Sequence, residues 1–176
     1  MFGEGPRGAR VLMIGEQPGD AEDLAGRPFV GPAGKVLDRA MEEAGLVRSD
    51  IYVTNAVKHF HNEPRGKKRI HRKPNLSHVR ACAPWLRAEL AAVQPEIVVA
   101  LGATAVQALL PRDVRVTADR GRIVPSELGP PVLVTVHPSS ILRAADEDRA
   151  TAMRAFVRDL GILTQPVEVT SAHGRG

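Results

Sequence analysis

Two short polar loops near the amino terminus carry the side chains best suited to chemistry. The segment GEQPGD (residues 15–20) follows a short apolar run and supplies the carboxylates of Glu16 and Asp20. The segment GRPFVG (residues 26–31) supplies Phe29. Open α/β sheets bind ligands beyond the carboxyl ends of their strands, so we expect these side chains to line one pocket. A carboxylate in such a pocket can act as a general base or orient a reacting group.

The same region lacks a phosphate-binding P-loop. That motif needs a glycine five residues before a Gly-Lys-Ser/Thr triplet. Here Gly34-Lys35 is followed by Val36, and Phe29 holds the upstream glycine position. The sequence therefore argues against ATP or GTP hydrolysis of this type.

The segment RGKKRIHRK (residues 65–73) holds six Lys or Arg in nine positions and no acidic residue. Each phosphate that such a segment neutralises releases counterions, so it would bind nucleic acid with strong salt dependence. A solvated loop without a partner is the alternative. Ile70 and His71 favour the first interpretation, because a purely electrostatic loop gains little from an apolar residue and an imidazole.

A third polar segment, VHPSS (residues 136–140), follows another apolar run. His137 stands at the expected strand end, and Ser139 or Ser140 is placed to cap the next helix, whose free N–H groups could hold a phosphate. Asn55 ends a further strand, where its amide could read a base edge with one donor and one acceptor. For His137 and Asn55 alike, a structural role at a turn is the alternative.

Short aliphatic runs alternate with amphipathic stretches along the chain. The runs are typical of strands buried on both faces of a parallel sheet, and we place them at 11–14, 51–55, 96–101 and 132–136. Helices are expected at 35–44, 76–92 with Ser77 as N-cap, 103–110 and 146–160. This order predicts an α/β fold, a three-layer α/β/α sandwich around a central four-stranded parallel sheet. We expect one domain over residues 1–163 and a flexible tail over 164–176.

Three loops of this layout leave the same edge of the sheet, namely residues 15–34, 55–74 and 136–140. The carboxyl ends of parallel strands meet at one edge. The polar side chains introduced above are therefore expected to converge on a single site.

Composition narrows the cellular context. The 176 residues suffice for one domain, and no apolar run is long enough to span a bilayer. The single cysteine excludes an internal disulfide framework and fits a reducing compartment. We expect a cytoplasmic monomer with no membrane contact and no disulfide-linked partner. The net charge of +4 is compatible with a polyanionic partner.

Four ordered motifs closely resemble those of the iron–sulfur uracil-DNA glycosylases, of the type-4-like kind: GEQPGD (15–20), GRPFVGPAG (26–34), VTNAVK (53–58) and VHPSS (136–140). The resemblance runs from Phe2 to about Leu160. The segment KKRIH (67–71) looks like the signature of the X-type enzyme, which becomes covalently attached to the DNA it attacks. The resemblance implies a uracil-DNA glycosylase-like fold and excision of uracil from single-stranded or opened DNA.

The resemblance also implies roles for the pocket residues. Phe29 would stack on the flipped uracil, Asn55 would hydrogen-bond its edge and reject cytosine, and His137 would donate to its O2. Further substrate contacts are expected from Gln17, Asp20 and Arg69. Arg69 is expected to anchor either its own loop or a phosphate.

For the X-type enzyme the resemblance implies that His71 attacks the sugar carbon C1′ and stays bonded. Glu16 would orient the imidazole or accept its proton. In conventional relatives a water molecule attacks instead. Contacts to the DNA backbone, without sequence preference, are expected from Lys67, Lys68, Arg72, Lys73, Ser139 and Ser140.

A [4Fe–4S] cluster is implied by the same resemblance, with His59 and Cys82 matching two of its ligands. The Cys-x-x-Cys pair that would supply two more is absent from the 176 residues. We expect either that the protein begins further upstream or that it has lost its cluster. A zinc site of His59, His61, His78 and Cys82 is a third interpretation, although the spacing matches no standard zinc finger.

Two functional classes remain open at this level. The favoured one is an enzyme that excises uracil from DNA. The alternative is a non-catalytic nucleic-acid-binding α/β module with a vestigial pocket. The joint presence of Glu16, Phe29, Asn55, His71 and His137 favours chemistry, because binding alone needs none of that set.

Overall fold

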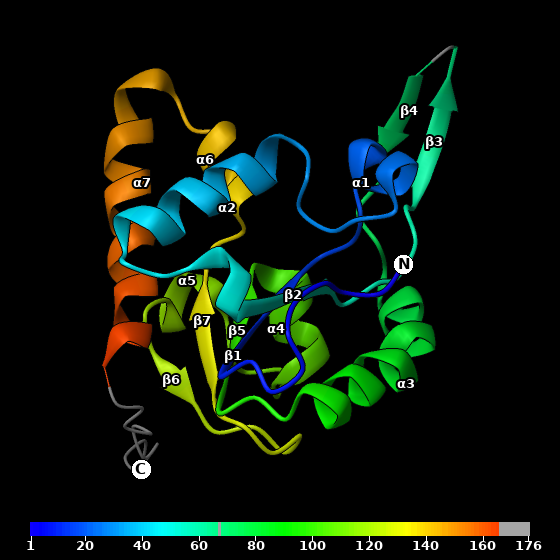
Figure 1. The fold of residues 1–176 in the computed structure, drawn as a ribbon. Coiled ribbons are helices and arrows are strands. Elements are labelled where there is room, and N and C mark those ends of the chain that lie inside the picture. The colour runs from blue at the N-terminus through cyan, green and yellow to red at the C-terminus, as the bar shows by residue number, and fades with distance from the viewer. Residues whose placement is uncertain (67, 166–176) are drawn as a thin grey trace.

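A mainly parallel sheet forms the centre of the molecule, as the computed structural model describes it over residues 1–66 and 68–165, without the side chain of Lys68. Five strands lie in the order β2-β1-β5-β7-β6 (Figure 1). Their bounds are β1 (Val11–Gly15), β2 (Ile51–Asn55), β5 (Ile97–Leu101), β6 (Ile123–Val124) and β7 (Val132–Thr135). The expected α/β sandwich is confirmed.

The expectation of a purely four-stranded sheet is wrong at one edge. The four expected strands are present and pair in parallel, but β6 adds a fifth strand antiparallel to β7. Because β6 has only two residues, it leaves no alternation that a sequence pattern could reveal.

Helices cover both faces of this sheet. One face carries α2 (Pro32–Glu43), α6 (Pro138–Leu142) and α7 (Asp146–Gly161), and the other carries α3 (Leu76–Val93) and α4 (Ala103–Leu109), as Figure 1 shows. The remaining elements are α1 (Asp20–Ala25), α5 (Val116–Asp119) and the 3-10 helices η1 (Arg48–Asp50) and η2 (Ile162–Thr164).

The strand residues alternate between two hydrophobic clusters, which explains their continuous apolar character. Val11 and Met13 pack with α2 and α7, whereas Leu12 and Ile14 pack with α3 and α4. Strands β1, β5 and β7 are buried over their whole lengths. Such double-sided burial fixes the strand ends in space, and the polar loops with them.

One helix start and one helix cap differ from the sequence-based expectation. Helix α2 begins at Pro32 rather than at residue 35, because proline suits the first turn, where its missing N–H costs no hydrogen bond. Helix α3 is capped by Asn75 and not by Ser77: the Asn75 side chain accepts hydrogen bonds from the N–H groups of Ser77 and His78. Asparagine is at least as good a cap as serine.

The long segment 55–74 is not a plain loop. It contains a two-stranded antiparallel hairpin, β3 (Asn62–Arg65) and β4 (Lys68–His71), that stands apart from the main sheet beside α1 (Figure 1). His71 pairs with Asn62 at the base of this hairpin.

The expected tail lies almost wholly outside the described residues, which end at 165. Before that point the chain is still packed, because Leu163 in η2 is fully buried. Among residues 1–66 and 68–165, no helix is long and apolar enough to cross a membrane.

Candidate active site

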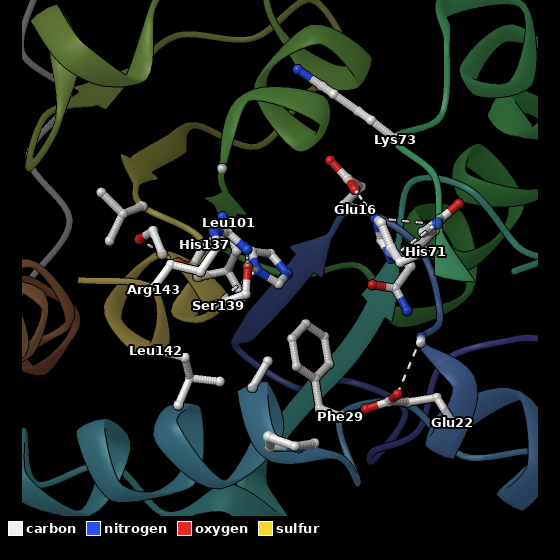
Figure 2. Close-up of a pocket in the computed structure, with 18 of the residues that line it drawn as sticks. Glu16, Glu22, Phe29, His71, Lys73, Leu101, His137, Ser139, Leu142 and Arg143 are labelled. Atoms are coloured by element: carbon white, nitrogen blue, oxygen red, sulfur yellow. Dashed lines mark hydrogen bonds and ion pairs between the residues drawn. The ribbon is translucent and has the colours of Figure 1, made fainter. Parts of the chain in front are cut away.

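A cavity of about 940 Å³ opens where β1, β2 and β7 end. Most of the predicted site residues line it: Glu16, Gln17, Asp20, Phe29, Asn55, His71, Lys73, His137, Ser139 and Ser140. Figure 2 shows Glu16 and His71 on one side, His137 and Ser139 on the other, and the Phe29 ring between them. The expected convergence of three loops is confirmed.

Glu16 and His71 form a hydrogen-bonded pair at one wall of this cavity. His71 Nε2 lies 3.0 Å from one carboxylate oxygen of Glu16, and Thr104 Oγ1 donates to the other at 2.6 Å. Burial disfavours the charged carboxylate, but the bonds from His71 and Thr104 outweigh it and hold the pKa of Glu16 below its ordinary value. An ionised Glu16 accepts a hydrogen bond from the Nε2–H group of His71 and fixes the imidazole beside the cavity. Sequence reasoning did not find Thr104, since a buried threonine at a helix start carries no pattern of its own.

His137 forms the opposite wall and is held as a neutral ring. Its Nδ1 accepts a hydrogen bond from the N–H of Ser139 at 3.2 Å, so the histidine itself caps α6. Burial lowers the pKa of His137 to about 4. A neutral imidazole with Nδ1 as acceptor carries its proton on Nε2, which leaves one N–H donor. The expected serine cap is therefore wrong: His137 caps the helix through Nδ1 and keeps its Nε2–H free of that contact.

The low pKa of His137 predicts acid-sensitive folding. Between pH 6.5 and 4 the unfolded chain binds a proton at this histidine that the folded chain does not, so stability falls as the pH falls. The loss is about 3 kcal/mol, complete near pH 4. Denaturant unfolding across this range should show a shallower pH dependence for His137→Gln, whose amide can still accept from Ser139. Equal slopes for the two proteins would contradict the prediction.

Phe29 is presented to the cavity by a strained loop. Its φ angle is +56°, a left-handed conformation that a bulky residue rarely adopts. The Phe29 carbonyl packs so tightly on Gly34 that a Cβ there would lie 1.8 Å from the oxygen. Buried Glu22 closes the loop by accepting the N–H groups of Gly19 and Gly31. These contacts explain the glycines of the motif and hold the ring in place.

Asn55 ends β2 and is 5 % exposed at the cavity floor. Within the described part of the chain its side-chain amide has no hydrogen-bond partner, so a donor and an acceptor remain for a ligand. Gly15 faces it, and a Cβ at Gly15 would lie 2.5 Å from Asn55 Oδ1 and 2.6 Å from the Phe29 ring. Only glycine leaves room for the two side chains to approach each other.

The amide of Gln17, expected to contact substrate, is committed to the base of the hairpin. Its Nε2 donates to the carbonyls of His61 and Arg72, and its Oε1 accepts the N–H of His61. The same nitrogen lies 3.2 and 3.4 Å from the two ring nitrogens of His71. Near-equal distances to both nitrogens place the amide against the ring face. Gln17 therefore fixes the hairpin and supports the His71 ring.

Arg69 lies outside the cavity lining and holds the hairpin against α1. Its guanidinium bonds Asp20 at 2.6 Å and Asp23 at 2.5 Å, and it lies 5.3 Å from the centre of the Phe60 ring. Of the two roles expected for Arg69, anchoring the loop is the one this geometry favours. Asp20 lines the cavity but is engaged in the same contact.

Loss of the Arg69 contact should loosen the hairpin without unfolding the protein. For Arg69→Ala we expect faster hydrogen exchange at the amides of β3 and β4. Without Arg69, these two strands have no other side-chain hydrogen bond to α1 among the described residues. Mass spectrometry of exchanged peptides measures this. Arg39→Ala, which breaks a surface pair with Glu43 on α2, serves as the control. Unchanged exchange in the hairpin would refute the clamp.

Some residues expected to contact a DNA backbone line the cavity, whereas others are paired with another side chain or lie outside the described residues. Lys73, Ser139 and Ser140 line the cavity, whereas Arg72 is paired with Glu63. Lys67 and the Lys68 side chain lie outside the described part of the chain. Arg143, which sequence reasoning missed, also lines the cavity, and its Nη1 donates to Ser139 Oγ at 3.0 Å.

The two expected cluster ligands do lie together. His59 Nδ1 is 3.8 Å from Cys82 Sγ, and the N–H of Lys58 donates to the sulfur at 3.3 Å. A [4Fe–4S] cluster takes four ligands, so this pair by itself does not complete its site. Within residues 1–66 and 68–165 no three His, Cys, Asp or Glu side chains are placed to hold a metal ion. The zinc interpretation is therefore not supported, although the ring centres of His61 and His78 lie 4.5 Å apart, with the rings tilted by 48°.

Comparison with known proteins gives a consistent picture. Residues 2–161 match the family model described as the Uracil DNA glycosylase superfamily. A Type-4 uracil-DNA glycosylase of Thermotoga maritima is 36 % identical over 158 residues, which cover 89 % of this chain and 77 % of the relative. A second, from Pyrobaculum aerophilum, is 35 % identical over 150 residues, covering 80 % and 72 %. A Type-5 uracil-DNA glycosylase of the same organism is 32 % identical, covering 90 % and 76 %.

Proposed function

Because this chain belongs to the uracil-DNA glycosylase superfamily, we propose that it is a DNA-repair glycosylase that cleaves the bond between uracil and deoxyribose. We propose further that its X-type chemistry ends in a covalent bond between His71 and C1′ of the sugar. The observation that carries the second part is the Glu16–His71 pair, which lies across the cavity from the neutral His137.

Recognition of uracil would use the two side chains that meet beside Gly15 in the cavity. A flipped uracil stacks on Phe29, and Asn55 offers its donor and acceptor to the base edge. Cytosine is rejected because its exocyclic amine presents a donor where uracil presents an acceptor. Unstacking a base costs a few kcal/mol and least when the base is already unpaired, so we propose single-stranded DNA as the preferred substrate.

Bond cleavage would place charge on both products. The electron pair of the C1′–N1 bond leaves with uracil, and the Nε2–H of His137 donates to uracil O2 to stabilise the anion. C1′ becomes electron-poor, and a lone pair of the His71 imidazole forms the new bond to it. Glu16 takes the proton that the alkylated ring gives up, and the uracil anion is protonated by solvent.

The backbone of the DNA would be held by cations around the cavity. Lys73 and Arg143 stand at different sides of it, as Figure 2 shows, and both can contact phosphates. In the sequence, further Lys and Arg residues stand on both sides of His71 in the segment 65–73. Such contacts make binding dependent on salt and independent of sequence.

A denaturing gel tests the proposal directly. The purified protein is mixed with uracil-containing single-stranded DNA, heated in detergent and examined for a protein band shifted by attached DNA. A shift that requires uracil, and is absent with thymine, supports the covalent reaction. An alkali-cleavable abasic site without a shift would mean attack by water. The absence of both the shifted band and the abasic site would contradict glycosylase activity in this chain.

A further inference from the structure

A cluster of buried polar side chains fastens the end of β2 to α3. Lys58 and Glu89 form an ion pair whose side chains are 8 % and 5 % exposed. Lys58 Nζ also donates to Thr54 Oγ1 and to the Asn55 carbonyl, each at 2.8 Å. With Glu89 as the third acceptor, all three protons of the ammonium group are used.

Glu89 collects donors from two further segments. It accepts from Tyr52 OH at 3.2 Å, from Thr54 Oγ1 at 3.0 Å and from the N–H of Gly3 at 2.6 Å. Burial, with the neighbouring Glu89 carboxylate, raises the pKa of Tyr52 to about 12, so its O–H stays a donor. Every member of the cluster has partners, which is the condition under which a buried polar network rigidifies its surroundings.

The cluster acts on the backbone that aims Asn55. The Asn55 side chain has no partner among the described residues, so its direction depends on its main chain. That main chain is held on one side by Lys58 Nζ at the carbonyl of Asn55. On the other side the N–H of Ala56 donates to the Gly15 carbonyl at 3.0 Å.

We propose that Lys58 and Glu89 are positioning residues that set the Asn55 amide against the uracil edge. The inference rests on the proposed function, because it assumes that Asn55 reads the base. A purely stabilising role is the rival explanation, but a buried ion pair often adds less stability than an apolar pair of similar volume. The hydrogen bond from Lys58 Nζ to the carbonyl of Asn55 is the contact that an apolar pair could not replace.

Two variants separate positioning from stability. Lys58→Met leaves the Glu89 carboxylate buried without its cation and should lower the melting temperature. The double variant Lys58→Met/Glu89→Leu removes both charges and should recover much of that loss. In both, we expect the single-turnover rate of uracil release at saturating protein to fall about 10- to 100-fold, with nearly unchanged affinity for DNA. Arg120→Met, which breaks the partly buried pair with Asp159, controls for destabilisation alone.

The inference is overturned if the double variant regains the wild-type rate together with its stability. If Lys58→Met does not fold, the double variant is measured alone. If neither of these variants folds, Glu89→Gln is measured in their place. If the wild-type protein releases no uracil, the proposed function fails separately. The position of the Asn55 side-chain amide signal in NMR spectra then decides, since it should shift in the cluster variants and stay unchanged in Arg120→Met.

Discussion

Replacement of His71 with alanine is expected to abolish the DNA-attached form of the protein completely. No other described imidazole faces Glu16, so no nucleophile of the same kind can take its place. Affinity for DNA should change little, because the hairpin keeps the contacts of Gln17 and Arg69. Denaturing gels with uracil-containing DNA measure the adduct, and filter binding measures the affinity.

The variant should also change the product. Removing the ring leaves space beside the Glu16 carboxylate, where a water molecule can be oriented for attack. Uracil release is then expected to continue and to leave an alkali-cleavable abasic site. His61→Ala, which removes a neighbouring imidazole that does not contact Glu16, should keep the adduct. An adduct that survives in His71→Ala would show that another residue attacks, and a collapse of DNA affinity would instead favour a binding module.

Loss of the His137 imidazole should slow the departure of uracil itself. Removing one donor that stabilises developing negative charge typically lowers a rate by about 10²- to 10³-fold. We expect a decrease of this size for His137→Ala in single-turnover uracil release, with adduct formation slowed equally, because both follow the same bond cleavage. His137→Gln should recover part of the rate, since its neutral amide can still donate.

The pH dependence distinguishes a neutral donor from a charged one at this position. With a pKa of about 4, His137 stays neutral from pH 5 to 8, so its own titration should not change the wild-type rate over that range. If the wild-type rate rises on acidification and the rate of His137→Gln does not, the charged imidazolium is the donor. Equal rates for wild type and His137→Ala would remove His137 from the reaction.

The strands and main helices were predictable because their signals are local. An aliphatic run buried on both faces, such as 11–14, is typical of a central strand whatever surrounds it. Glycine-bounded loops at strand ends likewise pointed to the edge where ligands bind. The short edge strand β6 and the hairpin β3–β4 gave no such signal, the first because it has two residues and the second because its charged residues match a solvated loop equally well.

Contacts across the chain corrected several individual roles. Gln17 lines the cavity and stays a predicted substrate contact, but its amide also donates to the carbonyl of Arg72, 55 residues away, and so supports the hairpin. Arg69, expected at a loop or a phosphate, is matched by Asp20 and Asp23. The serine expected to cap α6 is preceded by a histidine that performs the capping itself.

By itself, the sequence determined the four central strands and the main helices, the family to which the chain belongs and most of the residues that meet at the cavity. These depend on local apolar patterns and on motifs a few residues long. The tertiary structure alone decided which atom faces which: the His71 nitrogen that meets the expected partner Glu16, the donor nitrogen of His137 and the Lys58–Glu89 cluster behind Asn55. The Glu16–His71 and Lys58–Glu89 pairs join residues far apart in the chain, and their geometry is set by the packing of helices and loops on the sheet, which no local pattern encodes.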